Sequence, residues 1–337
     1  FITLMKLSLS MLFLIKFIKK FMMKDRESQI INKFFLPLAK NKESFGLSSD
    51  AALLNNNLVV SSDMMIEGTH FKKNHDPEKL AQKLLRVNLS DLAAMGSKPY
   101  GYILNLAIPN SSDNWLKKFS NGLKKDSKKF KIKLFGGDIS YSSKIFLGLT
   151  IFGKKINKLH TCSYANYKSD IFVSGNLGDA AVGYNILYDL KKIKCNGSDK
   201  KYFYDKFFLP DPKINIGIKL LGKVEFCTDI SDGIYTELCK ISDKSNLEAV
   251  IFLDKIPLSS NLKRTLKANN FKKIYNIVLG GGEDYQLLFS AKGKDSENLQ
   301  GVRGYHKIGY FRRGRGVKVM KNKSEIFSQK VESFSHF

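Results

Sequence analysis

The sequence predicts an α/β protein, built of α+β layers and divided into two domains. The chain has 337 residues, which is more than a single hydrophobic core usually organises. Hydrophobic residues make up 43% of the chain and aromatic residues 12%, which is enough for well-packed interiors. Short runs of β-branched residues alternate with segments of helical periodicity, and this alternation is typical of strands and helices arranged in layers.

The sequence divides into three segments. Residues 1–22 form a leader, interpreted as an upstream extension or a disordered segment, because its uncharged run of nine residues is too short to span a membrane as a helix. A weak amphipathic membrane anchor is the alternative for this leader. Residues 23–155 are predicted to form an N-terminal α/β domain, and residues 156–337 a C-terminal α/β domain.

In the N-terminal domain the clearest element is a long helix over residues 77–95. Asp76 is a typical N-cap, Pro77 suits the first helical position, and Gly96 suits the end. Apolar and β-branched runs predict the strands around it. The expected order is a helix at 26–39, a strand at 58–62, the long helix, a strand at 100–109, a helix at 115–130, and strands at 132–135 and 145–154, with a turn at 136–138 between the last two.

The C-terminal domain is predicted to begin with a strand, a glycine-containing turn and a helix. Ser231 is expected to cap a later helix whose inner stripe is formed by Ile234, Leu238 and Ile241. The expected order is a strand at 171–174, a helix from 179, a helix and a connecting loop within 189–215, a strand at 224–228, the helix after Ser231, and a strand at 286–291.

The chain is strongly basic, with 56 Lys and Arg against 31 Asp and Glu and a formal net charge of +25. Such a charge is compatible with nucleic-acid binding, but the lysines are spread along the chain and no nucleic-acid module is recognisable. We therefore expect an enzyme for anionic substrates, with neither nucleic acid nor membrane as a partner. The four cysteines form no CxxC pair, which favours reduced thiols in the cytoplasm over a zinc or redox site.

The few carboxylates recur where a predicted strand ends. Asp63 ends the run LVVSSD, Asp138 ends KLFGGD, and Asp229 and Asp232 lie in CTDISD. Oxygen ligands without Cys or His neighbours suit Mg²⁺ or Ca²⁺ rather than zinc. A basic chain that gathers its acidic residues in this way is expected to hold a cation there, so phosphate chemistry is the first functional hypothesis.

Asp91 gives the strongest single indication of such a site. At helical spacing, Leu84, Val87 and Asp91 fall within about 60° of one another, so the carboxylate lies on the apolar, inward face. A carboxylate in that position must be paired, coordinated or protonated. We favour metal coordination, and the alternatives are a buried salt bridge or a helix cap.

The other candidates have ordinary explanations when each is taken alone. Asp63 and the Gly-Gly-Asp of residues 136–138 could belong to turns, Asp232 could cap a helix, and His70 could be a half-buried histidine. The chain contains no GxxxxGK[ST] loop, no GxGxxG after a strand and no GxSxG elbow. These absences disfavour the common nucleotide-binding folds and the serine hydrolases.

Taken together, six motifs carry more information than any one of them. SSDMMIEGTHF, VNLSDLAAMGSKP, LFGGD, VSGNLGDAAVGYNIL, TDISDG and GGGEDYQLLF occur in that order, and the set resembles the thiamine-monophosphate kinase family of the aminoimidazole-ribonucleotide-synthetase-like ATP-binding superfamily. The resemblance covers residues 27–336. It implies a two-domain fold, a homodimer formed by the N-terminal domains, and transfer of the γ-phosphoryl group of ATP to thiamine monophosphate.

The resemblance also implies a metal site. The acceptor is a phosphate oxygen that is already anionic, so several Mg²⁺ ions are expected and no general base is assigned. Asp91, Asp138 and Asp229 would act in catalysis through the metal ions. The implied metal ligands are Asp50, Ser61, Ser62, Asp63, Asp91, Asp138, Asp229 and Asp232.

The resemblance further implies the residues that contact the two substrates. The nucleotide contacts would be Gly137, Asp138 and Ser231, and the thiamine-phosphate contacts would be His70, Glu283 and Phe334. Two positions depart from the family pattern, namely Ser49 in place of an Asp and Cys162 in place of an Arg for ATP. Two alternatives therefore stay open: a divergent, non-catalytic protein that binds nucleotide or thiamine phosphate, and another synthetase of the same superfamily.

Overall fold

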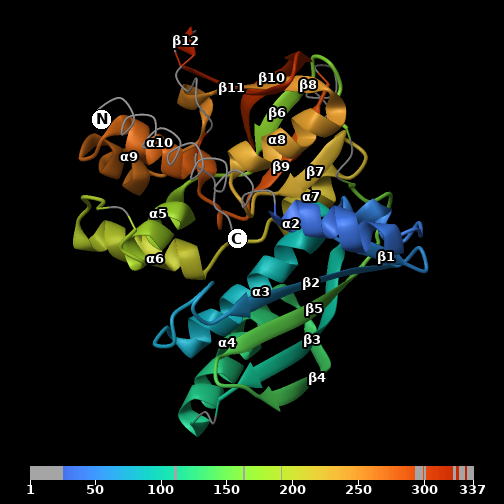
Figure 1. Ribbon diagram of the computed structural model, residues 1–337, viewed down its shortest axis with the longest axis vertical. Coiled ribbons are helices and arrows are strands. Elements are labelled where there is room, and N and C mark those ends of the chain that lie inside the picture. Colours follow the sequence, from blue (N-terminus) through green and yellow to red (C-terminus); the bar gives the residue numbers. More distant parts are fainter. Residues whose placement is uncertain are drawn as a thin grey trace, which may run out of the picture.

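The computed structural model describes residues 26–109, 112–161, 164–190, 192–292, 299, 301–321, 324–325 and 331. Its strands form two sheets, one of five strands and one of seven, with helices packed on both (Figure 1). The predicted α/β fold class is confirmed. The leader predicted for residues 1–22 lies outside the described part of the chain. Within the described part, no helix has the length and apolar character needed to cross a membrane.

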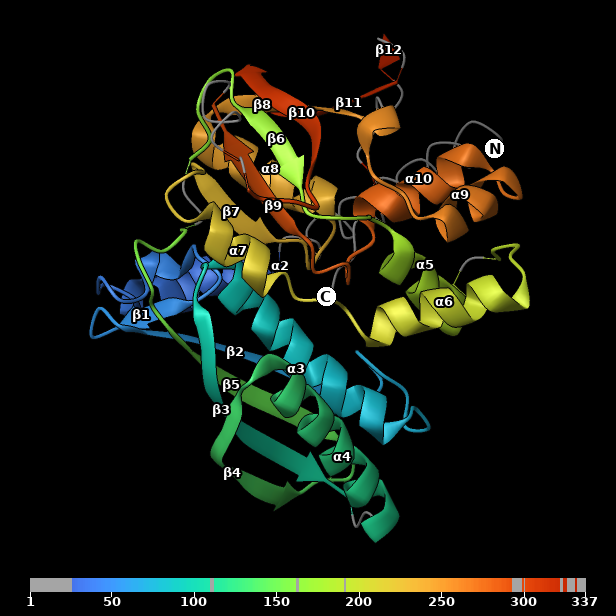
Figure 2. The same ribbon diagram turned by 180° about the vertical axis from the view of Figure 1, so that it is seen from behind.

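The N-terminal sheet has the strand order β1-β2-β5-β3-β4. Its strands are β1 (Ala52–Leu54), β2 (Leu58–Ile66), β3 (Lys98–Ile108), β4 (Lys133–Tyr141) and β5 (Phe146–Lys154). The central strand β5 pairs antiparallel with β2 and β3, whereas the edge strand β4 pairs parallel with β3. Helices α3 (Pro77–Ala94) and α4 (Asp113–Phe130) lie on one face of this sheet (Figures 1 and 2).

The core of this unit lies between the sheet and α3. Alternate residues of β5, namely Leu147, Leu149 and Ile151, are buried, as a strand with one covered face requires. Leu80 and Leu84 of α3 belong to the same buried cluster. Asp76 caps α3 by accepting a hydrogen bond from the backbone nitrogen of Glu78 at 3.1 Å, so the predicted start of this helix is confirmed.

The C-terminal sheet has the strand order β12-β11-β8-β10-β6-β9-β7. Its strands are β6 (Asp170–Val173), β7 (Phe226–Asp229), β8 (Leu247–Phe252), β9 (Leu287–Ala291), β10 (His306–Arg313), β11 (Gly316–Lys321) and β12 (Ser324–Glu325). The accompanying helices are α5 (Asp179–Leu187), α6 (Gly197–Phe208), α7 (Ile214–Leu220), α8 (Ile234–Ser245), α9 (Ser260–Lys267) and α10 (Phe271–Gly280).

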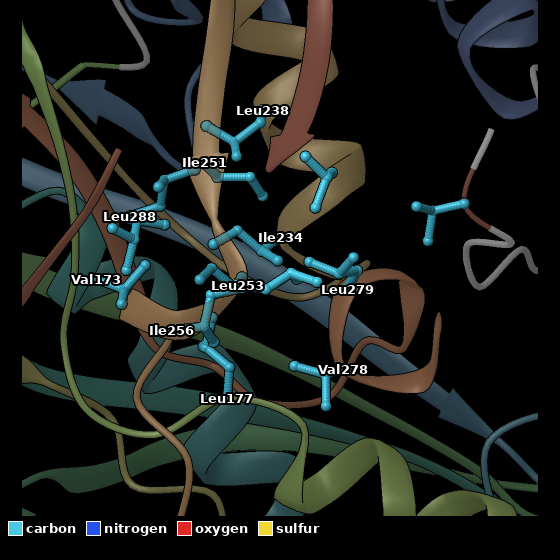
Figure 3. Close-up of a cluster of buried hydrophobic side chains, with 14 of the residues drawn as sticks. Val173, Leu177, Ile234, Leu238, Ile251, Leu253, Ile256, Val278, Leu279 and Leu288 are labelled. Atoms are coloured by element: carbon cyan, nitrogen blue, oxygen red, sulfur yellow. The ribbon is translucent and has the colours of Figure 1, made fainter. Parts of the chain in front are cut away.

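A buried apolar cluster holds α8 and α10 against the C-terminal sheet (Figure 3). Ile234 and Leu238 of α8 meet Ile251 of β8 and Leu288 of β9 in this cluster, and Val278 joins it from α10. The predicted inner stripe of α8 is therefore confirmed. Because α8 is fixed in this way, the loop that precedes it is held at the end of β7, where the acidic residues lie.

Three local predictions differ from the structure. Residues 136–138 do not form a turn, because they pair with Ile103, Leu104 and Asn105 of β3 inside strand β4. Ser231 is not the cap of α8, since the residue before the helix is Gly233, which makes no side-chain cap. The helix expected at 26–39 is broken into α2 (Arg26–Ile30), η1 (Ile31–Phe35) and η2 (Leu36–Leu38), because Pro37 cannot continue α-helical hydrogen bonding. The remaining short turns are η3 (Phe45–Leu47) and η4 (Leu253–Lys255).

Helix α3 also joins the two units. Its C-terminal part packs against α7 and β7 of the C-terminal unit. The closest approach is at Gly217 of α7, where an added Cβ atom would lie 1.9 Å from the carbonyl oxygen of Ala93. Only a glycine allows the two backbones to come this near. The close approach of α7 to α3 therefore requires a glycine at position 217.

Replacing Gly217 by Ala is expected to lower the melting temperature of the protein. The new methyl group would push α7 from α3, and such overpacking costs about 1–3 kcal/mol. The matched control is Gly197→Ala at the first residue of α6, where an added Cβ meets nothing within 4 Å. Equal melting temperatures for the two variants would contradict the proposed tightness of this contact.

Candidate active site

A cavity of about 260 Å³ lies where β2 and α3 meet the C-terminal unit. Residues from both units contribute to its walls, and most of them are polar or charged. The cavity is lined by Glu27, Asp50, Asp63, Met64, Met65, His70, Lys83, Val87, Asp91, Asp229, Ser231, Asp232, Glu283 and Tyr285. It therefore brings together most of the carboxylates that the sequence motifs singled out.

Three of these carboxylates, Asp50, Asp91 and Asp229, converge at one end of the cavity. Each offers an oxygen atom, and these oxygens all lie within 4.8 Å of one another. Asp50 precedes β1, Asp91 lies near the end of α3, and Asp229 ends β7. The inward orientation predicted for Asp91 from helical spacing is confirmed. We call these three residues the carboxylate triad.

Each member of the triad accepts a hydrogen bond from a nearby hydroxyl group. The donors are Thr228 for Asp50 at 2.8 Å, Ser61 for Asp91 at 2.6 Å, and Ser90 for Asp229 at 2.6 Å. These donors fix the side-chain orientations but bring no positive charge. Among the described residues, the second oxygen of Asp50, Oδ2, is buried without a hydrogen-bond partner.

Burial and mutual repulsion dominate the electrostatics of the triad. Burial, together with repulsion from Asp63, Asp229 and Asp50, raises the pKa of Asp91 well above its ordinary value. Burial and the neighbouring Asp50 raise the pKa of Asp229 to about 8. Burial raises the pKa of Asp50 to about 6. Carboxylates of which one is buried and two are half-buried, with an unbonded buried oxygen on Asp50, fit a hard divalent cation such as Mg²⁺.

Two further predicted ligands border the triad. Asp63 and Asp232 both line the cavity, and burial, Glu283 and Asp232 raise the pKa of Asp63 to about 6. The backbone nitrogen of Asp63 donates to the side-chain oxygen of Asn88 on α3 at 3.1 Å, which fixes β2 against the helix. Asp232 forms an ion pair with Lys240 at 3.3 Å. Five of the predicted ligands thus face one cavity.

The glycine-rich segment before β9 runs beside the loop that follows β7. The backbone nitrogen of Glu283 donates to the carbonyl oxygen of Ser231 at 2.8 Å, and that of Tyr285 donates to Ile230 at 2.9 Å. An added Cβ atom at Gly282 would lie 2.0 Å from the Ser231 oxygen, so this approach requires glycine. The contact explains how GGGED and TDISDG, which are far apart in sequence, form one wall.

The two acidic residues of GGGED have different positions. Glu283 lines the cavity, whereas Asp284 turns away and accepts hydrogen bonds from the backbone nitrogens of Gly178 at 2.6 Å and Ala180 at 3.3 Å. Asp284 therefore stabilises the start of α5 rather than the cavity. His70 lines the cavity as well, and its Nδ1 accepts from the backbone nitrogen of Ile66 at 3.0 Å.

Some predicted site residues lie elsewhere within one copy of the chain. The Ser62 hydroxyl contacts the carbonyl oxygen of Leu149 at 3.2 Å and does not line the cavity. Gly137 and Asp138 lie on β4, separated from β2 by β5 and β3, a distance of about 14 Å at ordinary strand spacing. Phe334 and Cys162 fall outside the described residues.

Sequence reasoning missed several residues that line the cavity, chiefly Lys83, Tyr285 and Glu27. A signal for Lys83 was present, because Lys83, Val87 and Asp91 follow one another at intervals of four along α3 and so share a face. No comparable pattern marks Glu27, which belongs to the short helix α2.

Comparisons with known proteins identify relatives in sequence and in structure. Residues 48–154 match the family described as AIR synthase related protein, N-terminal domain. A solved structure described as AaThiL complexed with AMPPCP and TMP superposes with a TM-score of 0.79 at 25% identity, covering 94% of this chain and 98% of that one.

Curated relatives match along most of their length. Thiamine-monophosphate kinase from Buchnera aphidicola subsp. Acyrthosiphon pisum is 36% identical over 333 residues, covering 94% of this chain and 100% of the relative. The Haemophilus influenzae protein of the same name is 32% identical, covering 81% of this chain and 84% of that protein. The family resemblance drawn from the six motifs is thus confirmed, and the chain belongs to the thiamine-monophosphate kinase family.

Proposed function

We propose that the chain transfers the γ-phosphoryl group of ATP to the phosphate of thiamine monophosphate, and that Mg²⁺ ions bound by the carboxylate triad carry this reaction. The products are thiamine diphosphate and ADP. The observation that carries the proposal is the convergence of Asp50, Asp91 and Asp229, whose carboxylates accept hydrogen bonds from hydroxyl groups and from no basic side chain of the described residues. The solved relative complexed with AMPPCP and TMP supports the choice of substrates.

The reaction needs charge neutralisation more than proton transfer. Both the donor and the acceptor are phosphates, and bound Mg²⁺ would offset the repulsion between them. The residues of the chain supply the rest. The triad, Asp63 and Asp232 provide oxygen ligands at one end of the cavity, and Ser231 lies beside them for contact with the nucleotide. His70 and Glu283 line the cavity as contacts for the thiamine part of the acceptor.

Label transfer from γ-³²P-ATP tests this function. Labelled thiamine diphosphate should form only when ATP, Mg²⁺ and thiamine monophosphate are all present, and thiamine itself should accept no label. Binding of both substrates without transfer would overturn the proposal in favour of a non-catalytic sensor. Transfer of label to a different acceptor would overturn it in favour of another synthetase of the superfamily.

We also propose the domain and compartment assignments that the sequence suggested. Residues 23–155 contain the five-stranded sheet and residues 156–337 the seven-stranded sheet, which supports a division into an N-terminal domain and a C-terminal domain. Cys195 is a free thiol, as suits a reducing cytoplasm.

A homodimer through the N-terminal sheets is the further proposal. Strand β4 ends the sheet and is exposed along its whole length. Ile139 is 68% exposed and Tyr141 80%, so this edge presents apolar surface that a second copy would cover. Association along β4 would also place Gly137 and Asp138 at the subunit boundary instead of on an open surface.

Replacing Ile139 by Glu is expected to convert the dimer into monomers, because a charge would be buried at the proposed contact. Sedimentation velocity of the wild-type protein and the variant measures this directly. Ile156→Glu is the control, since Ile156 is 52% exposed but lies outside β4. A monomeric wild-type protein, or an Ile139→Glu variant as dimeric as wild type, would contradict the proposed interface.

A further inference from the structure

We propose that Lys83 is a positioning residue for the acceptor, which holds the Glu283 carboxylate in the orientation that contacts the thiamine part of thiamine monophosphate. This inference rests on the proposed function and deepens it. Lys83 and Glu283 are 200 residues apart in the sequence, yet Nζ of Lys83 lies 2.8 Å from Oε2 of Glu283. Both side chains line the cavity.

Lys83 occupies an unusual place for a lysine. It lies in the middle of α3 with only 2% of its side chain exposed, although lysine side chains ordinarily keep their charge in water. Its Nζ lies 3.2 Å from the centre of the Phe207 ring, so an aromatic face supports the charge from one side. Burial lowers the pKa of Lys83, and the charge of Glu283 opposes this effect. The charge of Glu283 thus favours the protonated form of Lys83 against the effect of burial.

Lys83 lines the same cavity as the carboxylate triad, two turns of α3 before Asp91. Lys83, Val87 and Asp91 form one stripe along α3, and eight residues of α-helix span about 12 Å. An elongated molecule with a phosphate at the triad would therefore place its other end near Lys83 and Glu283. A phosphorylated acceptor with an organic ring system has this shape.

Glu283 is held under constraint. Its backbone φ is +75°, in the left-handed region that glycine favours, and Tyr285 has a φ of +48°. Such conformations cost free energy and persist where the surrounding structure over-determines them, often at ligand sites. Here the hydrogen bond from the Glu283 nitrogen to Ser231 and the ion pair to Lys83 supply two of the constraints.

The pair keeps hydrogen-bonding capacity that the described residues do not use. Although 2.8 Å apart, Lys83 Nζ and Glu283 Oε2 are both buried without a well-directed hydrogen bond to any residue of the described ranges. Buried polar atoms of this kind normally find partners. A ligand group that enters the cavity can supply such partners. Because Oε2 of Glu283 forms the ion pair with Lys83, Oε1 is left to accept a hydrogen bond from the acceptor substrate.

Lys83 also limits repulsion inside the cavity. Glu283 shares the cavity with Asp63 and Asp232, and the charge of Glu283 is one cause of the raised pKa of Asp63. Without Lys83, the buried Glu283 carboxylate would be left without compensation and would turn from its present position. Lys83 therefore acts on the acceptor through Glu283.

Lys83→Met tests this inference, because it should change the KM for thiamine monophosphate but not the KM for ATP. The variant keeps the length of the side chain and removes its charge. The KM for thiamine monophosphate is expected to rise about tenfold or more, because one partner of a buried charge pair is lost. The KM for ATP should change by less than about twofold. Calorimetric titration with thiamine monophosphate alone should show the same weakening without turnover.

A double-mutant cycle distinguishes positioning from a general structural effect. If Lys83 acts through Glu283, then Lys83→Met should cost no further affinity for thiamine monophosphate in a Glu283→Gln background. The melting temperature of the double variant should recover part of what Lys83→Met loses, since no buried charge remains unpaired. These readouts would not follow from loss of packing alone.

Lys79 provides the matched control on the same helix. Its Nζ lies 2.5 Å from Oδ1 of Asp205 and 4.4 Å from the centre of the Tyr204 ring, but it does not line the cavity. Lys79→Met should leave both KM values unchanged. An unchanged KM for thiamine monophosphate in Lys83→Met, or independent costs of the two variants in the cycle, would overturn the inference. If the wild-type protein formed no thiamine diphosphate, the proposed function would be overturned instead.

Discussion

Replacing Asp91 by Asn is expected to abolish turnover and to raise the melting temperature of the metal-free protein. Turnover falls because the variant removes one charged ligand from the triad, and loss of a metal-mediated contribution of several kcal/mol corresponds to a rate reduction of about 10³-fold or more. Stability rises because Asp91 is repelled by Asp63, Asp229 and Asp50 in the absence of a cation. Steady-state kinetics and thermal melting measure the two effects on one preparation.

The opposite signs of these effects make the test specific. A mutation that damaged the fold would lower activity and melting temperature together. Asp76→Asn is the control, because Asp76 caps the same helix away from the cavity and Asn caps equally well. If Asp91→Asn kept near-normal activity, or lost stability in the absence of metal, the assignment of Asp91 as a ligand would be wrong.

Removing Mg²⁺ is expected to stop turnover and to make the stability of the protein depend strongly on pH. The pKa values of Asp50, about 6, and of Asp229, about 8, lie above the ordinary value of 3.8. Between pH 4 and 8 the folded chain therefore retains protons that the unfolded chain has released. Stability that is present at about pH 4 is lost as the pH rises, because the folded state then binds more protons than the unfolded state.

Melting temperatures measured from pH 4 to pH 8, with EDTA and with Mg²⁺, test this expectation. Mg²⁺ should raise the melting temperature most at high pH, since a cation binds the deprotonated carboxylates and releases their protons. Glu237 and Asp284 also have raised pKa values, of about 7 and 8, but both lie outside the triad. The contribution of Asp284 is present with and without Mg²⁺, whereas Glu237 repels Asp50 and titrates together with the triad. The difference between the two curves therefore reports the metal site together with Glu237. Parallel curves of melting temperature against pH, with EDTA and with Mg²⁺, would contradict metal binding by the triad.

The residues of the site differ in how far the sequence could predict them. Asp91 was predictable because helical periodicity places it on the buried face of α3, and that geometry is local. Asp229 ends β7, as its sequence predicts, whereas Asp63 lies inside β2, where pairing with Leu149 of β5 extends the strand beyond the predicted end. The convergence of Asp91 and Asp229 with Asp50 within 4.8 Å depends on packing between the two units, which no local pattern encodes.

Two errors have the same physical origin. The two glycines of residues 136–138 predict a turn, yet pairing with β3 keeps these residues extended. Lys83 looked like any other lysine of a basic chain, because only the tertiary structure places Glu283 and Phe207 beside it. In both cases a contact that is distant in sequence overrides the preference of the residue itself.

Metal binding by the triad is best measured by titrating Mn²⁺, as a paramagnetic substitute for Mg²⁺, into the protein with a non-hydrolysable ATP analogue and thiamine monophosphate. Electron paramagnetic resonance counts the bound ions. The wild-type protein should bind Mn²⁺ tightly. Asp91→Asn should lower the affinity for at least one Mn²⁺ ion by more than the about 10–100-fold that is typical when only a residue behind a metal ligand is lost. Equal stoichiometry and affinity in the two proteins would contradict a metal centre built on Asp50, Asp91 and Asp229.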